Sequence, residues 1–119
     1  MAAERSRNQL TELAHHDPLT GALNRGGLAQ HLPALGSQPV SLLIIDIDHF
    51  KQLNDRHGHA AGDDILRLFA SVSRGIMRSD DLLARQGGDE FLAVLKNVSR
   101  EDAVAIAERI RLAFAAAVL

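Results

Sequence analysis

Two acidic residues that could bind a metal follow a short apolar run. The run covers residues 40–45, and Asp46 and Asp48 come directly after it. Because they are spaced two apart, their side chains would leave the end of a strand on the same side. A carboxylate placed there is costly to leave unpaired, so a divalent cation is a natural partner. Strand-end capping and turn formation are the alternative explanation for this pair.

A second acidic pair follows two adjacent glycines in the segment Gly87-Gly88-Asp89-Glu90. We predict a hairpin turn here because Gly and Asp separate two apolar runs. Adjacent glycines permit positive φ angles and the close approach of a bulky ligand. Consecutive acids at the tip face opposite ways, so one of them could reach Asp46 and help to hold a metal. The alternative is a solvated turn that happens to be acidic.

Between the two acidic pairs lies a polar segment, residues 50–63, which we predict to be a loop before a long helix. Its residues could recognise a nucleotide. The Asp63 carboxylate can accept hydrogen bonds from the N1–H and amino group of guanine, and the Asn54 amide adds a donor or an acceptor. Lys51 is a candidate contact for a phosphate. The histidines of this segment are better explained by loop hydrogen bonds or helix entry.

The elements that must position these residues are predicted from hydrophobic periodicity and turn signals. Residues 1–16 carry a thin apolar stripe that favours a connector helix, and Asp17-Pro18 ends it. The run at 40–45 is typical of a strand buried on both faces. The other predicted elements are a helix at about 24–32, a loop at 33–39, a helix at 63–77, strands at 82–85 and 90–95, and a final helix capped by Ser99. This order predicts an α/β or α+β fold with helices layered over a sheet.

Composition narrows the function further. The length of 119 residues fits one small domain. The net charge of −2 gives no case for binding nucleic acid. The absence of cysteine excludes disulfides, thiolate zinc sites and thiol catalysis, so a metal site would use oxygen ligands and favour Mg²⁺. No apolar run approaches the roughly 20 residues of a membrane span. The ending AAAVL has no helix cap, and we expect the chain to stop short of the end of its domain.

In their joint order, the motifs resemble the GGDEF domain of diguanylate cyclases from about residue 17 onward. The matching stretches are DPLTG (17–21) with Asn24-Arg25, DIDHFKQLND (46–55), GHAAGDD (58–64) and RQGGDEF (85–91). The resemblance implies a palm-like ferredoxin variant, similar to adenylyl cyclases, that lacks its last strand and helix here. It also implies condensation of two GTP into cyclic di-GMP and two pyrophosphates, by a cytoplasmic homodimer that works behind an upstream sensor.

The resemblance assigns the metal and catalytic roles residue by residue. Asp46, Asp89 and the backbone carbonyl of Ile47 would hold two Mg²⁺ or Mn²⁺ ions per half-site. Glu90 would help to activate the attacking 3′-hydroxyl, and Asp89 and Lys51 would complete the catalytic group. Catalysis of this kind works by positioning and by charge stabilisation.

The resemblance also assigns substrate and product sites. Asn54 and Asp63 would bind the guanine, and Gly88 would let the nucleotide lie across the hairpin. Three consecutive residues would contact the phosphates: His49, Phe50 and Lys51. The Arg78-Ser79-Asp80-Asp81 motif matches the RxxD site that binds cyclic di-GMP as an inhibitor, and Arg78, Asp81 and Arg109 would form it.

Three alternatives stay open at this point. The RxxD motif could be only a salt bridge at a helix end. The domain could bind GTP or cyclic di-GMP and regulate a partner without turnover. A phospho-receiver domain also has an apolar strand ending in acids, but the Gly-Gly-Asp-Glu hairpin and the lack of alternating parallel βα units argue against it.

Overall fold

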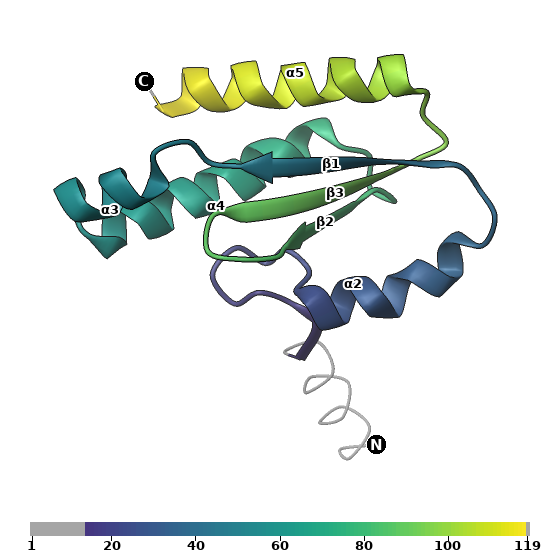
Figure 1. Ribbon diagram of the computed structural model, residues 1–119, viewed down its shortest axis with the longest axis horizontal. Helices are drawn as coiled ribbons and strands as arrows, with labels where there is room; N and C mark the ends of the chain where they lie inside the picture. Colours follow the sequence, from purple (N-terminus) through teal and green to yellow (C-terminus); the bar gives the residue numbers. More distant parts are fainter. Residues whose placement is uncertain (1–13, 119) are drawn as a thin grey trace.

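The computed structural model describes residues 14–118 (Figure 1). In chain order, the elements are α2 (Arg25–His31), a 3-10 helix (Leu32–Leu35), β1 (Val40–Asp46), α3 (Phe50–His57), α4 (His59–Ile76), β2 (Leu82–Arg85), β3 (Glu90–Lys96) and α5 (Arg100–Val118). Most of the connector helix expected over residues 1–16 lies outside the described residues. Within residues 14–118, no helix combines the length and the hydropathy needed to span a bilayer.

The three strands form one antiparallel sheet in the order β1-β3-β2. The predicted hairpin joins β2 to β3, and Arg85 pairs with Phe91 across it. The register of β1 on β3 places Asp46 directly opposite Glu90. The mixture of helices with an antiparallel sheet confirms the α+β expectation.

Each face of the sheet contributes to its own apolar cluster. On one face, the sheet side chains pack against α4 and α5. Its buried members include Leu66, Phe69, Ala70, Leu83, Phe91, Ala93 and Ile110. Phe69 is central, because its ring lies 4.8 Å from that of Phe91 and meets the ring of Phe114 edge-on at 5.2 Å. The opposite face packs against α2 and the segment before it, through Leu23, Leu28, Leu82, Ala84 and Val94.

The loop predicted over residues 50–63 is wrong, because α3 and the start of α4 occupy it. The two helices are separated only by Gly58, whose φ of 88° is a conformation that favours glycine. The residues of α3 are mostly good helix formers, and its half-buried Phe50 and Leu53 stand three apart. A short helix with so thin an apolar stripe is stabilised mainly by packing on its neighbour α4.

The expectation that the strand at 40–45 is buried on both faces is also wrong. Among the described residues β1 is an edge strand, and alternate side chains are exposed, with Leu42 at 59% and Ile44 at 76%. The other set, which includes Leu43 and Ile45, packs against the α4–α5 cluster. A branched apolar run therefore occurs here on a strand with only one covered face.

The remaining predicted elements are close to those observed. The 33–39 loop contains the 3-10 helix, and β2 and the α2 region lie where expected. Ser99 caps α5, since its hydroxyl accepts a hydrogen bond from the Asp102 N–H at 3.1 Å.

Asp17 anchors the turn that leads into α2. Its carboxylate accepts hydrogen bonds from the Thr20 N–H at 2.9 Å and the Thr20 hydroxyl at 2.7 Å, and it pairs with Arg85 at 3.1 Å. Burial alone would raise the pKa of Asp17, but the Thr20 hydrogen bonds and the Arg85 charge together hold this pKa below its ordinary value.

We expect Asp17→Asn to lower the free energy of unfolding by about 1–3 kcal/mol at neutral pH, because a mostly buried charged hydrogen-bond acceptor is lost. A depressed native pKa stabilises the fold above the unfolded pKa of about 3.9, and this stabilisation is lost as pH falls through the native pKa. Urea unfolding of both proteins across a pH series measures this. A difference that stays constant through pH 4 and below would contradict the role of the charge.

Candidate active site at the β1 end and the signature hairpin

Acidic residues from two strands meet where β1 ends. Asp46 pairs in register with Glu90, and the Ile47 N–H donates to the Asp89 carbonyl at 3.1 Å. The hairpin turn is thus tied to the residue that follows Asp46. Like charges directly opposite each other in an antiparallel pair are destabilising, so a bound cation would stabilise this arrangement.

The carboxyl groups of Asp46 and Asp89 are close enough to interact directly. A hydrogen bond with Asp89 is the largest cause that raises the pKa of Asp46, and the negative charge of Asp89 comes next. Glu90 and Asp48 add smaller repulsions in the same direction. A carboxyl whose pKa is raised by like charges is a favourable place for a cation, which removes the repulsion.

A metal ion fits this pair if substrate oxygens complete its coordination. Within residues 14–118, no three His, Cys, Asp or Glu side chains are arranged to hold a metal ion by themselves. Mg²⁺ is usually bound by one or two carboxylates, with waters and substrate phosphates as the other ligands. Asp46 and Asp89 supply the two carboxylates, and the Ile47 carbonyl stays the predicted third protein ligand.

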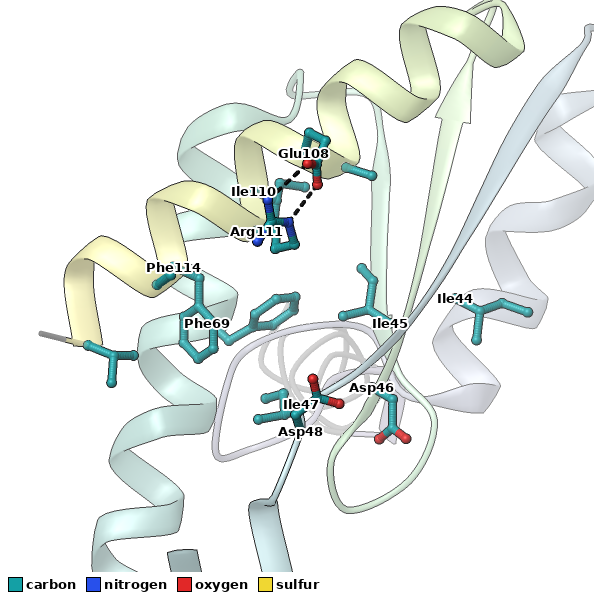
Figure 2. Close-up of a pocket in the computed structure, with 13 residues that line it drawn as sticks. Ile44, Ile45, Asp46, Ile47, Asp48, Phe69, Glu108, Ile110, Arg111 and Phe114 are labelled. Carbon is teal, nitrogen blue, oxygen red and sulfur yellow. Dashed lines mark hydrogen bonds and ion pairs between the residues drawn. The ribbon is translucent and has the colours of Figure 1, made fainter.

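A cavity of about 620 Å³ lies between β1 and α5 and has Asp46 and Asp48 at one end (Figure 2). Its other walls are mainly apolar and include Phe69 and Phe114. None of the predicted substrate-binding residues lines it. We therefore locate the candidate site by the convergence of the acidic side chains and not by this cavity.

Asn54 has a buried amide oxygen that accepts no hydrogen bond among the described residues. A buried polar atom without a partner is costly, and a ligand that donates a hydrogen bond would satisfy it. Gly62 of α4 lies directly against this oxygen, because a Cβ built at Gly62 would stand 1.8 Å from it. The structure thus brings Asn54 of α3 next to the residue that precedes Asp63, the other predicted guanine contact.

The predicted phosphate contacts lie at the start of α3. His49 has a left-handed conformation, with φ 58° and ψ 26°, and provides no side-chain cap. Phe50 and Lys51 form the first turn of the helix, and Lys51 is exposed. The uncapped N–H groups of a first helical turn suit a phosphate, and the lysine adds a positive charge.

Arg78 and Asp81 form the helix-end salt bridge considered above, and both also contact the backbone of Lys96. The Asp81 side chain is 1% exposed and accepts hydrogen bonds from Arg78 and from the Lys96 N–H at 3.1 Å. Arg78 also donates to the Lys96 carbonyl, so the motif joins the end of α4 to the end of β3. Arg78 remains half exposed and lines a cleft of about 370 Å³, whereas Arg109 is exposed on α5 and does not line that cleft.

Two site features were not predicted from sequence. The first is the steric role of Gly62, because the predicted loop over residues 50–63 placed this glycine outside the helix, where only the close approach of a ligand was expected of it. The second is Arg85, whose side chain contacts the carbonyls of Gly87 and Gly88. In the sequence, an arginine next to a Gly-Gly turn is only a weak signal that its side chain binds the carbonyls of that turn.

The chain is similar to known proteins over most of its length. The family described as "Diguanylate cyclase, GGDEF domain" matches residues 14–118. Diguanylate cyclase DgcM of Escherichia coli is 40% identical over 120 residues, which cover 94% of this chain and 29% of DgcM. The chain therefore spans less than a third of that relative.

Two solved structures share the fold. The GGDEF domain of PA1120 (TpbB or YfiN) from Pseudomonas aeruginosa is 43% identical with a TM-score of 0.76, and the match covers 83% of this chain and 62% of that one. The coiled coil and GGDEF domain of DgcB from Caulobacter crescentus, solved in complex with c-di-GMP, is 30% identical with a TM-score of 0.82. That match covers 92% of this chain and 62% of the DgcB chain.

Proposed function

Because the chain belongs to the diguanylate cyclase GGDEF domain family, we propose that it is a catalytic domain that condenses two GTP into cyclic di-GMP and two pyrophosphates. The observation that carries the proposal is the meeting of Asp46 with the Asp89-Glu90 hairpin at the end of β1. Its direct test is the ratio of pyrophosphate released to cyclic dinucleotide formed. Purified protein supplied with GTP and Mg²⁺ should release two pyrophosphates for each cyclic dinucleotide.

In the proposed mechanism, Asp46 and Asp89 would hold divalent cations, Mg²⁺ or Mn²⁺, together with the Ile47 carbonyl. When bound, these cations neutralise charge on the phosphates and on the developing oxyanion. The 3′-oxygen of one GTP forms a bond to the α-phosphorus of the other, and the bond to pyrophosphate breaks. Glu90 is exposed beside Asp46 in the sheet register, where it can accept the 3′-hydroxyl proton.

We propose that Asn54 and Asp63 bind the guanine and that the α3 start binds the phosphates. The buried amide oxygen of Asn54 supports the first assignment, because guanine carries N–H donors that would satisfy it. Gly88 is exposed with open space around it, so a nucleotide can approach the hairpin closely. One chain then holds one GTP. Two chains must face each other for two GTP to react, which makes a homodimer the catalytic unit.

We further propose that cyclic di-GMP inhibits the domain by binding at Arg78 and Asp81. The cleft beside Arg78 also contains Arg74 and His31, which suit an anionic ligand. Arg109 does not line this cleft, so in our proposal it contributes from outside it. The domain would lie in the cytoplasm, and an upstream sensor would control it.

Arg78→Ala should weaken the binding of cyclic di-GMP by about 10-fold or more, because a guanidinium contact to the ligand is lost. Calorimetry with cyclic di-GMP measures this, and product inhibition should be relieved in parallel. Since Asp81 is buried against Arg78, the thermal midpoint must be recorded to confirm that the variant is folded at the assay temperature. An unchanged affinity in the folded variant would exclude this site.

A GGDEF module that binds GTP or cyclic di-GMP without turnover is the second candidate. The cleft beside Arg78 supports it, because none of the acidic residues at the end of β1 lines that cleft. Such a module would keep the Asn54 and Arg78 contacts but release no pyrophosphate. The pyrophosphate measurement therefore separates the two candidates.

A further inference from the structure

The guanidinium of Arg85 holds the turn that precedes Asp89. Its Nη2 and Nε atoms donate to the Gly88 carbonyl at 2.8 and 3.1 Å, and Nε also lies 3.3 Å from the Gly87 carbonyl. The third nitrogen, Nη1, faces Asp17, with its carboxylate oxygens at 3.1 and 3.3 Å. One planar cation thus joins the signature hairpin to a residue 68 positions earlier in the chain.

We propose that Asp17 and Arg85 are a positioning pair that sets the place of Asp89 in the active site. This inference rests on the proposed function, because it concerns the placement of a carboxylate that would bind the metal. Neither Asp17 nor Arg85 would contact the reacting atoms of the nucleotides. Both act through the backbone of the hairpin.

The backbone geometry explains how the pair would act. The Gly88 carbonyl and the Asp89 N–H belong to the same planar peptide unit, so a fixed carbonyl fixes the plane from which Asp89 departs. The next peptide unit is held as well, because the Asp89 carbonyl accepts the hydrogen bond from the Ile47 N–H. Asp89 therefore lies between two anchored peptide units, one held by Arg85 and the other by the end of β1.

Side-chain packing does not hold the turn in place. A Cβ at Gly88 would meet no atom within 4 Å, and one at Gly87 would meet only Glu90 at 3.9 Å. The main-chain bonds that close the turn run from the Gln86 and Gly87 N–H groups to the Glu90 carbonyl, at 2.8 and 3.4 Å. Within residues 14–118, the side-chain hydrogen bonds to the Gly88 carbonyl come from Arg85 alone.

Asp17 in turn restrains Arg85. Their side chains are only 16% and 19% exposed, so solvent screens the pair weakly. Thr20 donates two hydrogen bonds to the same carboxylate and leaves it one orientation toward Arg85. Arg25 adds a parallel link, because its Nε donates to the Gln86 carbonyl at 3.2 Å. Asp17 and the start of α2 are thus linked to the hairpin through Arg85 and Arg25, respectively.

The test uses Arg85→Lys, which keeps the charge but loses the planar fork, and Asp17→Asn, which keeps the shape but loses the charge. The probe is Mn²⁺ with a GTP analogue whose α–β bridge is methylene and which cannot release pyrophosphate. We expect each variant to bind Mn²⁺ about 10-fold more weakly, as is typical when a residue that orients a metal ligand is changed. The double variant should be no weaker than the worse single variant, because the two residues act as a unit.

Amide hydrogen exchange supplies a readout that needs no nucleotide. In both variants the amides that donate to the hairpin carbonyls, Gln86 to Glu90 and Ile47 to Asp89, should exchange faster, and by a larger factor than the Ala93 amide in the middle of β3. A merely structural role would speed exchange by the same factor along the whole sheet. The matched control is Arg67→Lys, which alters an exposed ion pair with Asp64 on α4 and should change neither readout.

Each outcome decides between the claims. Unchanged Mn²⁺ binding and turn exchange in folded Arg85→Lys would overturn the positioning role alone. Failure of the unchanged chain to bind Mn²⁺ with the analogue would contradict the proposed function instead. If Arg85→Lys does not fold, the Arg85 Nε–H of the unchanged chain decides by nuclear magnetic resonance, because it should exchange at least about 10-fold more slowly than that of exposed Arg67. Equal exchange rates would overturn the pair.

Discussion

Asp89→Ala should reduce the formation of cyclic di-GMP from GTP by about 10³-fold or more, since charge stabilisation by a bound metal contributes several kcal/mol to such a reaction. The variant loses one of the two carboxylates that meet at the end of β1. It should nevertheless stay folded. Besides a hydrogen bond, Asp89 places a negative charge beside Asp46 that raises the pKa of Asp46, so its removal relieves a repulsion. We therefore expect a thermal midpoint at least as high as that of the unchanged chain without metal.

The matched control is Asp64→Ala on α4. Asp64 is 77% exposed in a salt bridge with Arg67, and exposed pairs of this kind contribute little to stability. Product formation by this control should stay within about twofold of the unchanged protein. Product formation by Asp89→Ala at the level of this control would refute the assignment of Asp89 as a metal ligand.

Gly62→Ala should weaken GTP binding by about 10- to 100-fold, which corresponds to the loss of roughly one or two hydrogen bonds to the base. The new Cβ would stand 1.8 Å from the Asn54 amide oxygen and 3.2 Å from the Phe50 ring. Asn54 must then move, and the packing of α3 on α4 must open. Calorimetry with the methylene analogue of GTP measures the change, and circular dichroism records the helix content.

Gly75→Ala is the control on the same helix. A Cβ at Gly75 meets nothing within 4 Å, so this change should raise stability by about 0.5–1 kcal/mol and leave GTP binding unaltered. The pair separates helix propensity from the steric contact at Asn54. If Gly62→Ala bound the analogue as tightly as Gly75→Ala, Asn54 would not be a guanine contact.

The sequence was most informative where structure is decided locally. The hairpin of β2 and β3 follows from two apolar runs around a Gly-Gly-Asp turn, and the cap of α5 follows from Ser99 and Asp102. Short-range signals of this kind need no knowledge of which strands pair. The meeting of Asp46 with the hairpin acids, in contrast, depends on the pairing of β1 with β3, so residue types could only suggest it.

Other features depend on contacts between distant residues and could not be predicted in this way. The place of β1 at the edge of the described sheet is set by strand order, which its apolar run does not encode. The helical state of α3 depends on packing against α4, because its own apolar stripe is thin. The contact of Arg85 with Asp17 joins residues 68 positions apart, and neither residue type nor local spacing indicates it.

The most direct test of the central claim is the mass-spectrometric detection of cyclic di-GMP from GTP and Mg²⁺. It should be run on this chain and on a version extended at its C-terminus to the length of the solved GGDEF domain of PA1120, which this chain covers to 62%. Binding of the methylene analogue of GTP is measured on the same samples. We predict that the extended protein forms cyclic di-GMP with two pyrophosphates per product. An extended protein that binds the analogue but forms no cyclic di-GMP would contradict the catalytic claim and leave the nucleotide-binding module in its place.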